Sequence, residues 1–414
     1  MPGRRDSLRN KPETLPLKRH VHAAPAERSR DTTMKHVLVI LTAAALLASC
    51  RREDVVYYPD QTSAGRTQHT EWAGFYLLNE GNMGSNKSTL DYYDFGTATY
   101  TRNIYANANP TVVQELGDVG NDLRIYGDRL YAVINCSNLL EVMDARTARH
   151  IGSVEVPNCR YICFEGGYAY LTSYAGPVEV GKEHAQIGYV AKIDTAALQV
   201  VDTCLVGYQP DGICAAGGKL YVANSGGYMV PDYEDELSVI DRASFRETGR
   251  IKVAINLHRV LADSHGGIWV SSRGDYYGTP SRLFRVSSAT GTVTDTINTA
   301  TSEMCLTGDS IYLCGTEYNY QTGKTTVNYG IVNVVTRSLV SDSFITDGTE
   351  SEITVPYGLA VNSANGDIYV TDARDYVSPG KLVCYDRAGV RQWTVRTGDI
   401  PAHFAFLPQP ASTP

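Results

Sequence analysis

Aspartates that recur along the chain are the first candidates for chemistry. Five of them stand at the ends of apolar stretches, just before short polar turns: Asp94, Asp144, Asp194, Asp241 and Asp386. A repeated carboxylate could serve as a general acid or base. However, an aspartate at a strand end commonly accepts hydrogen bonds from the backbone N–H groups of the turn that follows. We therefore expect these five residues to cap turns.

Other combinations of residues give little support for catalysis. Asn121, Asp122, Asp211 and Asp263 do not form a recognisable metal-binding set, and no CxxC, CxxCH or HExxH motif occurs. His258 is the best-placed histidine for a metal or proton-transfer role. No second imidazole or carboxylate stands beside it in the sequence, which favours a structural or hydrogen-bonding role. No Ser/His/Asp order can be assigned, so we expect no catalytic residues and no cofactor.

Binding chemistry is better represented, because the chain has 28 tyrosines against 8 phenylalanines. A tyrosine offers both an apolar ring and a hydroxyl that remains hydrated, which suits a surface that contacts a partly polar ligand. Packing of the loops is the competing explanation for any one tyrosine. The candidate ligand-binding residues are Asn82, Met83, Asn86, Arg160, Tyr174, Gln209, Tyr228, His258, Arg259, Arg273, Tyr276, Tyr277, Tyr318 and Arg374.

A repeated strand pattern must position these residues. Seven short apolar segments each have an aromatic residue at an equivalent position, namely Tyr76, Tyr131, Tyr170, Tyr221, Trp269, Tyr312 and Tyr369. Their separations of 55, 39, 51, 48, 43 and 57 residues are typical of propeller blades. Six of the seven follow a turn rich in Gly or Asp, which indicates a tight hairpin. The sequence therefore predicts an all-β fold, a seven-bladed β-propeller.

Both ends of this repeat suggest how the ring closes. Nothing strand-like precedes Gly74, so blade one begins at its second strand, and residues 400–406 resemble a spare first strand. We expect this C-terminal strand to complete blade one and remove an open sheet edge. The propeller would then be one domain spanning residues 72–410.

Loop lengths indicate which face of the propeller binds. The connections between second and third strands are long, at 79–87, 173–188, 224–236, 271–282, 316–329 and 372–381, whereas the turns on the other face are short. Long loops carried by a rigid scaffold commonly hold binding sites. The connections between blades, including Asn121, Asn158, Tyr161 and Tyr357, are expected nearer the central channel.

The N-terminal part of the chain has the pattern of an export signal. Residues 1–33 are polar and basic and are expected to be a leader outside the fold. Residues 34–49 contain a short basic region and an apolar run that is too short to span a membrane. The small residues before Cys50 resemble a bacterial lipobox, so we expect Cys50 to be lipidated and residues 50–71 to form a tether.

The charge and the cysteines of the mature chain exclude several classes of function. Without residues 1–49 the chain has 28 Lys and Arg against 41 Asp and Glu, a formal charge of −13. This acidic balance, without a basic run, argues against nucleic acid and against an anionic membrane surface as partners. Eight cysteines remain, most of them within apolar strand segments, where a free cysteine behaves as a small buried apolar residue.

Four segments carry a resemblance to a known family: residues 78–87 (LNEGNMGSNK), 117–122 (GDVGND), 224–228 (NSGGY) and 269–277 (WVSSRGDYY). Together with the blade repeat, they resemble the YncE-like propeller lipoproteins of gut Bacteroidetes. That family includes surface lipoproteins that capture cobalamin and pass it to a TonB-dependent outer-membrane transporter. The acidic residues after Cys50 also resemble a surface-export signal of Bacteroidetes lipoproteins.

The resemblance implies a lipid-anchored protein of the outer membrane, on the cell surface, that binds cobalamin or a related corrinoid. Two alternatives remain open. A propeller hydrolase of the lactonase type is suggested by residues 210–213 (PDGI) and an acidic interior. A glycan-binding propeller would also be compatible with a rim rich in tyrosine.

Overall fold

The computed structural model of the protein describes residues 60–65, 71–112 and 116–410. Cys50, the expected leader and the expected signal peptide lie outside the described residues. Within the described part the chain is almost entirely β-structure, with one short α-helix, α2 (Ile104–Ala108), and 3₁₀ turns at Lys182–His184 and Thr349–Glu352. No helix in these ranges is long and apolar enough to cross a membrane.

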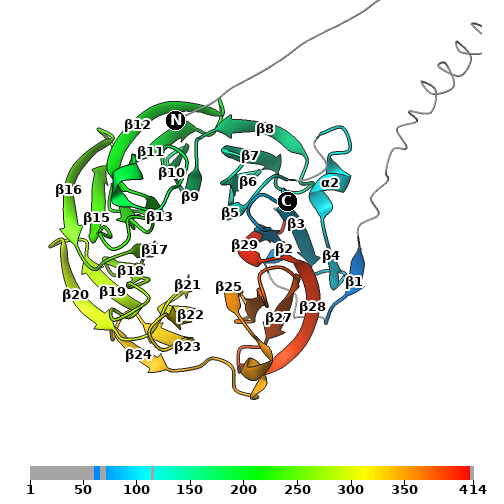
Figure 1. Cartoon of the computed structure of the whole chain (residues 1–414). Coiled ribbons are helices and arrows are strands. Elements are labelled where there is room, and N and C mark those ends of the chain that lie inside the picture. Colours follow the sequence, from blue (N-terminus) through cyan, green and yellow to red (C-terminus); the bar gives the residue numbers. More distant parts are fainter. Residues whose placement is uncertain (1–59, 66–70, 113–115, 411–414) are drawn as a thin grey trace, which may run out of the picture. The chain divides into compact units, whose positions relative to one another are not determined.

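Seven antiparallel sheets form a ring, as expected for a seven-bladed propeller (Figure 1). Blade one contains β29 (Pro401–Pro408), β2 (Trp72–Asn79), β3 (Thr89–Asp94), β4 (Thr99–Thr101) and β1 (Gln61–Ser63). Blades two and three contain β5 (Gly120–Tyr126), β6 (Arg129–Ile134), β7 (Leu139–Asp144) and β8 (His150–Glu155), then β9 (Cys159–Glu165), β10 (Tyr168–Ser173), β11 (Ile187–Asp194) and β12 (Gln199–Tyr208).

The remaining blades repeat the same order of four strands from the centre outward. Blades four and five contain β13 (Pro210–Ala216), β14 (Lys219–Asn224), β15 (Glu236–Asp241) and β16 (Arg246–Lys252), then β17 (Leu257–Ala262), β18 (Gly267–Ser272), β19 (Arg282–Ser287) and β20 (Thr292–Ile297). Blades six and seven contain β21 (Glu303–Thr307), β22 (Ser310–Asn319), β23 (Lys324–Asn333) and β24 (Ser338–Ser341), then β25 (Pro356–Val361), β26 (Ile368–Asp372), β27 (Pro379–Tyr385) and β28 (Arg391–Asp399).

The predicted closure of the ring is confirmed. Strand β29 occupies the first position of blade one and pairs antiparallel with β2, with Phe75 opposite Phe406 and Leu77 opposite Phe404. Strand β1 was not predicted. It pairs with β4 as a fifth, outermost strand, although residues 61–63 fall in the segment expected to be a tether.

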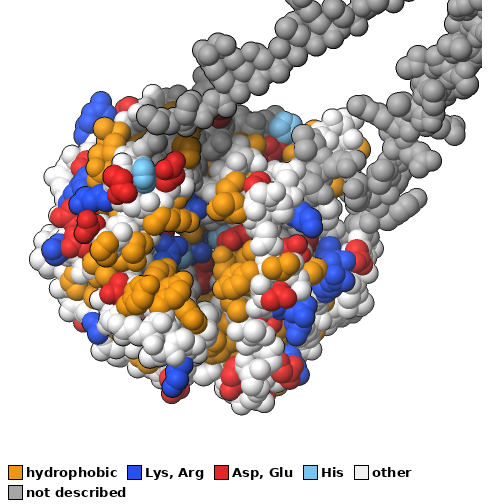
Figure 2. Space-filling model, viewed as in Figure 1, with side chains coloured by type: hydrophobic (Ala, Val, Ile, Leu, Met, Phe, Trp, Pro, Cys, Tyr) orange, Lys and Arg blue, Asp and Glu red, His pale blue; other side chains and the backbone are white. Residues whose placement is uncertain are grey.

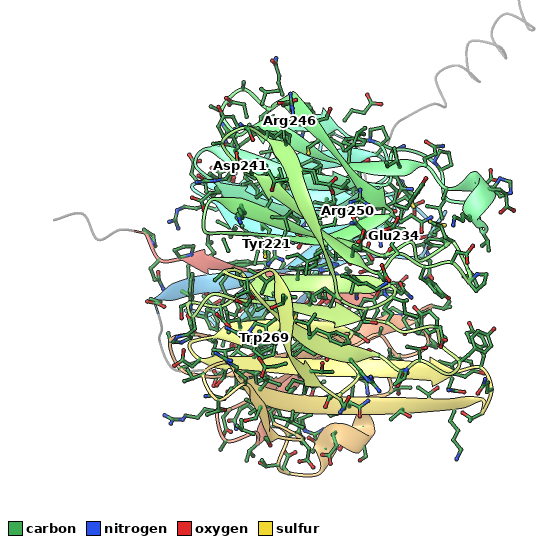
Figure 3. All side chains as sticks on the ribbon, turned by 90° about the vertical axis from the view of Figure 1, so that its left-hand side faces the viewer. Tyr221, Glu234, Asp241, Arg246, Arg250 and Trp269 are labelled. Atoms are coloured by element: carbon green, nitrogen blue, oxygen red, sulfur yellow. The ribbon has the colours of Figure 1, made fainter. Side chains whose placement is uncertain are left out.

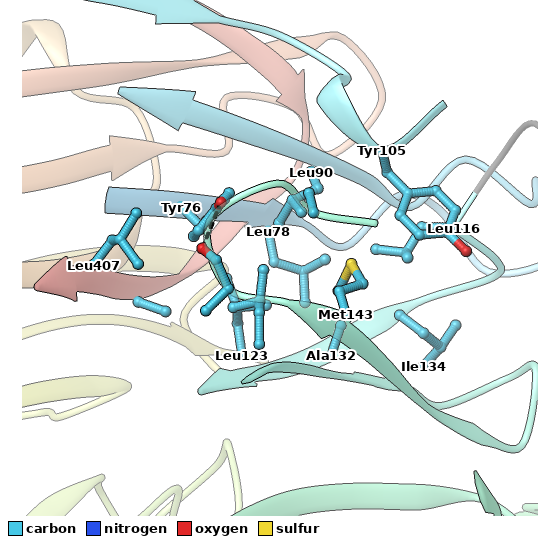
Figure 4. Close-up of a cluster of buried hydrophobic side chains, with 14 residues drawn as sticks. Tyr76, Leu78, Leu90, Tyr105, Leu116, Leu123, Ala132, Ile134, Met143 and Leu407 are labelled. Carbon is cyan, nitrogen blue, oxygen red and sulfur yellow. Dashed lines mark hydrogen bonds between the residues drawn. The ribbon is translucent and has the colours of Figure 1, made fainter. Parts of the chain in front are cut away.

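The aromatic residue of each repeat lies on the second strand of its blade. Tyr76, Tyr131, Tyr170, Tyr221, Trp269 and Tyr369 are at most 2% exposed, and Tyr312 is half-buried. Seven apolar clusters fill the spaces between neighbouring blades. Figure 4 shows the cluster between blades one and two, in which Leu78 packs with Leu123 and Ala132, and the Tyr76 hydroxyl donates to the Ala145 carbonyl at 2.8 Å. The core is therefore divided among the blade interfaces.

The recurrent aspartates cap turns, as predicted. Asp144 Oδ1 accepts hydrogen bonds from the backbone N–H groups of Arg146 and Thr147, and Asp241 Oδ1 accepts from the N–H of Ser244. Asp94, Asp194 and Asp386 make equivalent bonds. Because these carboxylates accept hydrogen bonds within turns, we do not interpret them as a repeated catalytic acid.

One of the expected loops is instead part of a sheet. Residues 316–329 were predicted to be a loop, but β22 and β23 continue as a ladder through Thr316↔Val327 to Asn319↔Lys324. The β-branched residues of this stretch favour an extended backbone, which extends the sheet beyond the usual blade length. Figure 3 shows this long yellow hairpin reaching past its neighbours on one side of the ring.

Candidate functional site

A cavity of about 940 Å³ opens at the centre of the face that carries the connections between second and third strands. This is the face on which the sequence predicted a binding site. Figure 2 shows it hollowed at the centre of the ring, with blue and orange side chains inside the hollow. A second cavity of about 440 Å³, lined by the innermost strands, shares Tyr161 and Arg259 with the first.

A buried carboxylate organises one wall of the main cavity. Asp211, at the start of β13, is 0% exposed and accepts from the Tyr174 hydroxyl at 2.6 Å. Its Oδ1 also lies 3.2 Å from Arg160 Nε, and its Oδ2 lies 2.8 Å from Arg273 Nη1. Burial raises the pKa of this carboxyl, but Arg273 and Arg160 outweigh burial and hold the pKa below its usual value. Asp211 is therefore ionised and shared by two guanidinium groups.

The backbone around Asp211 explains how these side chains meet. Gln209, just before β13, has a left-handed φ of 49° and accepts a hydrogen bond from the Tyr228 N–H through Oε1 at 2.7 Å. The next residue after Asp211 is Gly212, where a Cβ would lie 2.5 Å from the His258 carbonyl oxygen. Glycine thus permits close approach of β13 and β17, which brings Asp211 near the start of blade five.

Aromatic rings hold the arginines in place. The Arg160 guanidinium lies 4.8 Å from the centre of the Tyr174 ring, and that of Arg259 lies 4.5 Å from the Tyr161 ring centre. Such contacts add attraction and fix the plane of a guanidinium. Arg259 also forms an ion pair with Glu303 at 2.5 Å.

His258 lies within this group but does not share its charge. Its Nε2 lies 3.2 Å from the Tyr161 hydroxyl, and its Nδ1 is buried without a hydrogen-bond partner among the described residues. Burial and the charges of Arg273, Arg259 and Arg160 hold the pKa of this imidazole well below its usual value. His258 is therefore neutral at pH 7 and serves as an uncharged hydrogen-bonding group.

The other walls of the cavity carry amides and a second acidic group. Asn135 Nδ2 donates to Asn158 Oδ1 at 2.6 Å, and both residues line the cavity. Glu80 Oε2 accepts from the Tyr357 hydroxyl at 2.8 Å, while its Oε1 lies 3.1 Å from His403 Nε2. The cavity therefore offers amides, aromatic rings and both signs of charge.

No site for a metal ion is evident in residues 60–65, 71–112 and 116–410, where no three His, Cys, Asp or Glu side chains are grouped for coordination. The eight cysteines in these ranges are free thiols. Burial raises the pKa of the Cys159 thiol to about 12, which keeps it protonated and unreactive.

A family profile assigned to a domain of unknown function, DUF5074, matches residues 73–390. The chain belongs to the DUF5074 family. The match covers most of the ring from β2 onward. No curated protein matches the sequence significantly.

Solved structures show the same fold at low sequence identity. A quinoprotein alcohol dehydrogenase-like protein from Bacteroides thetaiotaomicron has a TM-score of 0.54 and 16% identity, over 82% of this chain and 79% of that one. A candidate 6-phosphogluconolactonase from Bacteroides fragilis has a TM-score of 0.56 and 13% identity, over 82% and 100%. Kuenenia stuttgartiensis hydrazine synthase has a TM-score of 0.51 and 15% identity, over 68% and 86%. These likenesses place the DUF5074 domain among propellers and say nothing further of its chemistry.

The DUF5074 cavity gathers eight of the predicted binding residues. These are Met83, Arg160, Tyr174, Tyr228, His258, Arg259, Arg273 and Tyr276. The other six, which do not line it, are Asn82, Asn86, Gln209, Tyr277, Tyr318 and Arg374. Gln209 instead supports the backbone of Tyr228, and Tyr277 stacks on Tyr320 with ring centres 5.3 Å apart.

Several residues of the cavity were not among the candidates. Glu80, Asn135, Asn138 and Glu317 line it, as do Asn121, Asn158, Tyr161 and Tyr357, which lie at the connections between blades that were expected near the channel. Their position was a usable signal, because each of those connections leads into an innermost strand.

Proposed function

We propose that this DUF5074 protein is a non-catalytic binding protein whose central cavity takes a large, partly polar small molecule, cobalamin or a related corrinoid. The observation that carries the proposal is the combination of size and lining. A volume of about 940 Å³ lies at the upper end of the roughly 300–1,000 Å³ typical of small-molecule sites. The open mouth allows a ligand larger than the cavity to remain partly exposed.

The lining suits the surface of a corrinoid. A corrin ring is flat and carries many amide side chains, which need hydrogen-bond donors and acceptors. Four asparagines line the cavity, namely Asn121, Asn135, Asn138 and Asn158, together with five tyrosines, Tyr161, Tyr174, Tyr228, Tyr276 and Tyr357, and the guanidiniums of Arg160 and Arg273. Aromatic rings can cover an apolar face while amides and guanidiniums satisfy polar groups at its rim.

A hydrolase of the lactonase type has less support from the cavity. Such an enzyme would need acidic and amide oxygens free to hold a metal ion. Both oxygens of Asp211 are engaged by Arg160, Arg273 and Tyr174, and Glu80 is engaged by His403 and Tyr357. Binding therefore remains the function that the geometry supports best.

The export pattern completes the proposal. An anchor at Cys50 would hold the propeller at the outer membrane, on the cell surface, where a TonB-dependent transporter could receive the ligand. Replacing Cys50 by Ser should abolish incorporation of labelled fatty acid and release the protein from the membrane fraction. Retention of the label by Cys50→Ser would contradict the anchor.

Calorimetric titration of the purified propeller with cyanocobalamin tests the ligand. We expect one site per chain with a Kd below about 1 μM, equivalent to a binding free energy stronger than about −8.2 kcal/mol. Absence of heat, or a weaker Kd, would reject cobalamin as the ligand. Metal analysis of the same preparation, with an assay for ester hydrolysis, separates the alternatives: bound metal together with turnover would favour the hydrolase.

A further inference from the structure

Two arginines share one carboxylate at the cavity wall. Arg160 uses Nε and Arg273 uses Nη1 to contact Asp211. Within the described residues the other guanidinium nitrogens of these two arginines make no hydrogen bond, and neither arginine forms an ion pair with a second carboxylate. None of those nitrogens is among the buried side-chain atoms that lack a partner, so they remain accessible from the cavity. The side chains of Arg160 and Arg273 are 17% and 26% exposed, whereas that of Asp211 is 0% exposed.

The charges of this group do not cancel. Asp211 is ionised because the two guanidiniums lower its pKa. Desolvation lowers the pKa values of Arg160 and Arg273, but Asp211 and the neighbouring tyrosine hydroxyls, which are neutral at pH 7, raise them above the ordinary value, so both arginines stay protonated. Two positive charges therefore face one negative charge. A partly buried charge without a partner is costly, which favours a ligand that brings the missing negative charge.

The other ionic groups of the cavity leave this surplus in place. Arg259 is paired with Glu303, and Glu80 contacts His403 and Tyr357. Glu317 accepts a hydrogen bond from the Ser281 N–H. Glu80, Glu303 and Glu317 belong to blades one and six, whereas Arg160, Asp211 and Arg273 come from blades three, four and five. The surplus of positive charge is thus confined to one side of the cavity.

The arginines are also held in a geometry suited to recognition. Tyr174 both donates to Asp211 and packs against the Arg160 guanidinium, so Arg160, Tyr174 and Asp211 form one fixed group. A guanidinium fixed in this way can direct two parallel N–H groups at the oxygens of a phosphate or carboxylate.

We propose that Arg160 and Arg273 bind an anionic oxygen group of the ligand, which in a corrinoid is the phosphodiester of the nucleotide loop. The identity of that group as a phosphodiester rests on the proposed function. The anion site itself rests on the two arginines and can be tested without a corrinoid.

The first experiment compares two corrinoids, cyanocobalamin and dicyanocobinamide, which lacks the nucleotide loop and its phosphodiester. Arg273→Gln should weaken cyanocobalamin binding about tenfold or more, as expected for a lost charge-assisted hydrogen bond, and change dicyanocobinamide binding less than about twofold. Arg273→Lys keeps the positive charge, so it should lose less affinity for cyanocobalamin than Arg273→Gln does. Equal losses for both corrinoids in Arg273→Gln would overturn the proposal.

A matched control lies on the same face of the ring. Arg374 does not line the cavity and donates through Nη1 to the Pro379 carbonyl at 3.2 Å. Arg374→Gln should bind both corrinoids as the wild type does. Arg273→Gln should remain folded, because Asp211 still has its contacts with Arg160 and Tyr174 in this variant. The melting curve of Arg273→Gln tests this expectation.

If neither corrinoid binds, the proposed function is wrong. Inorganic phosphate then tests separately whether Arg160 and Arg273 form an anion-binding site. Millimolar phosphate, compared with chloride at equal ionic strength, should raise the melting temperature of the wild type and of Arg374→Gln but not of Arg273→Gln. The same response in all three proteins, or none in the wild type, would show that the arginines form no anion site.

Discussion

Phe75 of β2 lies directly opposite Phe406 of β29, and their ring centres are 5.6 Å apart. The two residues come from opposite ends of the described chain. Both pack in the cluster between blades seven and one, which also contains Tyr93 and Tyr369. The closure of the ring is therefore an apolar contact as well as a ladder of backbone hydrogen bonds.

Deletion of residues 399–414 should strongly destabilise the protein. It removes β29, exposes the edge of β2 and uncovers apolar side chains of two interblade clusters. We expect the loss of most of a stability that is about 5–15 kcal/mol for a typical domain. Thermal and urea unfolding measure it, and an unchanged melting temperature would refute closure by this strand.

Asp211→Asn should cost about 3 kcal/mol or more of unfolding free energy. The change leaves the guanidiniums of Arg160 and Arg273 without the buried carboxylate that pairs with both of them. Asp241→Asn is the control, because Asp241 caps a partly exposed turn (Figure 3) and Asn can still accept from the Ser244 N–H. Its expected cost is below about 1 kcal/mol. Urea unfolding of both variants would contradict this assignment if their losses were equal.

Tyr228→Ala should weaken cyanocobalamin binding about tenfold, whereas Tyr318→Ala should change it less than about twofold. The two tyrosines are similarly exposed, at 39% and 41%, but only Tyr228 lines the cavity. Titration calorimetry of both variants measures the difference. A larger loss of affinity in Tyr318→Ala than in Tyr228→Ala would contradict binding in the cavity and indicate that the ligand contacts the hairpin of β22 and β23.

His258 should make the protein less stable in mild acid. In the unfolded chain its pKa is the ordinary 6.5, whereas burial and Arg273, Arg259 and Arg160 hold it well below that value in the folded protein. Below pH 6.5 the unfolded chain therefore binds a proton that the folded protein does not. The unfolding free energy then falls as pH falls, by about 1.4 kcal/mol per pH unit for one proton.

Urea unfolding between pH 7 and pH 5 tests the role of His258. His258→Gln should show a shallower fall than the wild type. Equal slopes for the wild type and His258→Gln would show that His258 is not responsible.

The architecture was predictable because its signals are local. An aromatic residue on a short apolar strand, after a glycine turn, recurs with each blade, and Gly127, Gly217 and Gly366 adopt the positive φ that such turns require. Strand β1 carries no such signal. Its three polar residues are exposed and pair with β4 only through the backbone.

The site was predictable only in part, because it depends on neighbours that are distant in sequence. Asp211 and Arg273 are separated by 62 residues, and their contact follows from the placement of adjacent blades. Gln209 shows a second role that a polar residue can have. A polar residue in a connecting segment suggested ligand contact, but its amide supports the loop that carries Tyr228. Sequence alone does not distinguish a residue that touches a ligand from one that holds such a residue.

Placing β29 beside β2 also sets an order for biosynthesis. The ribosome makes β29 after every other strand of the ring, so a growing chain carries β2 as an unpaired edge until translation has passed residue 408. Blades two to seven each have all four strands from one continuous stretch and can form earlier. A chain truncated before Pro401 would keep a strand edge that invites pairing between molecules, which makes incomplete translation products prone to aggregate.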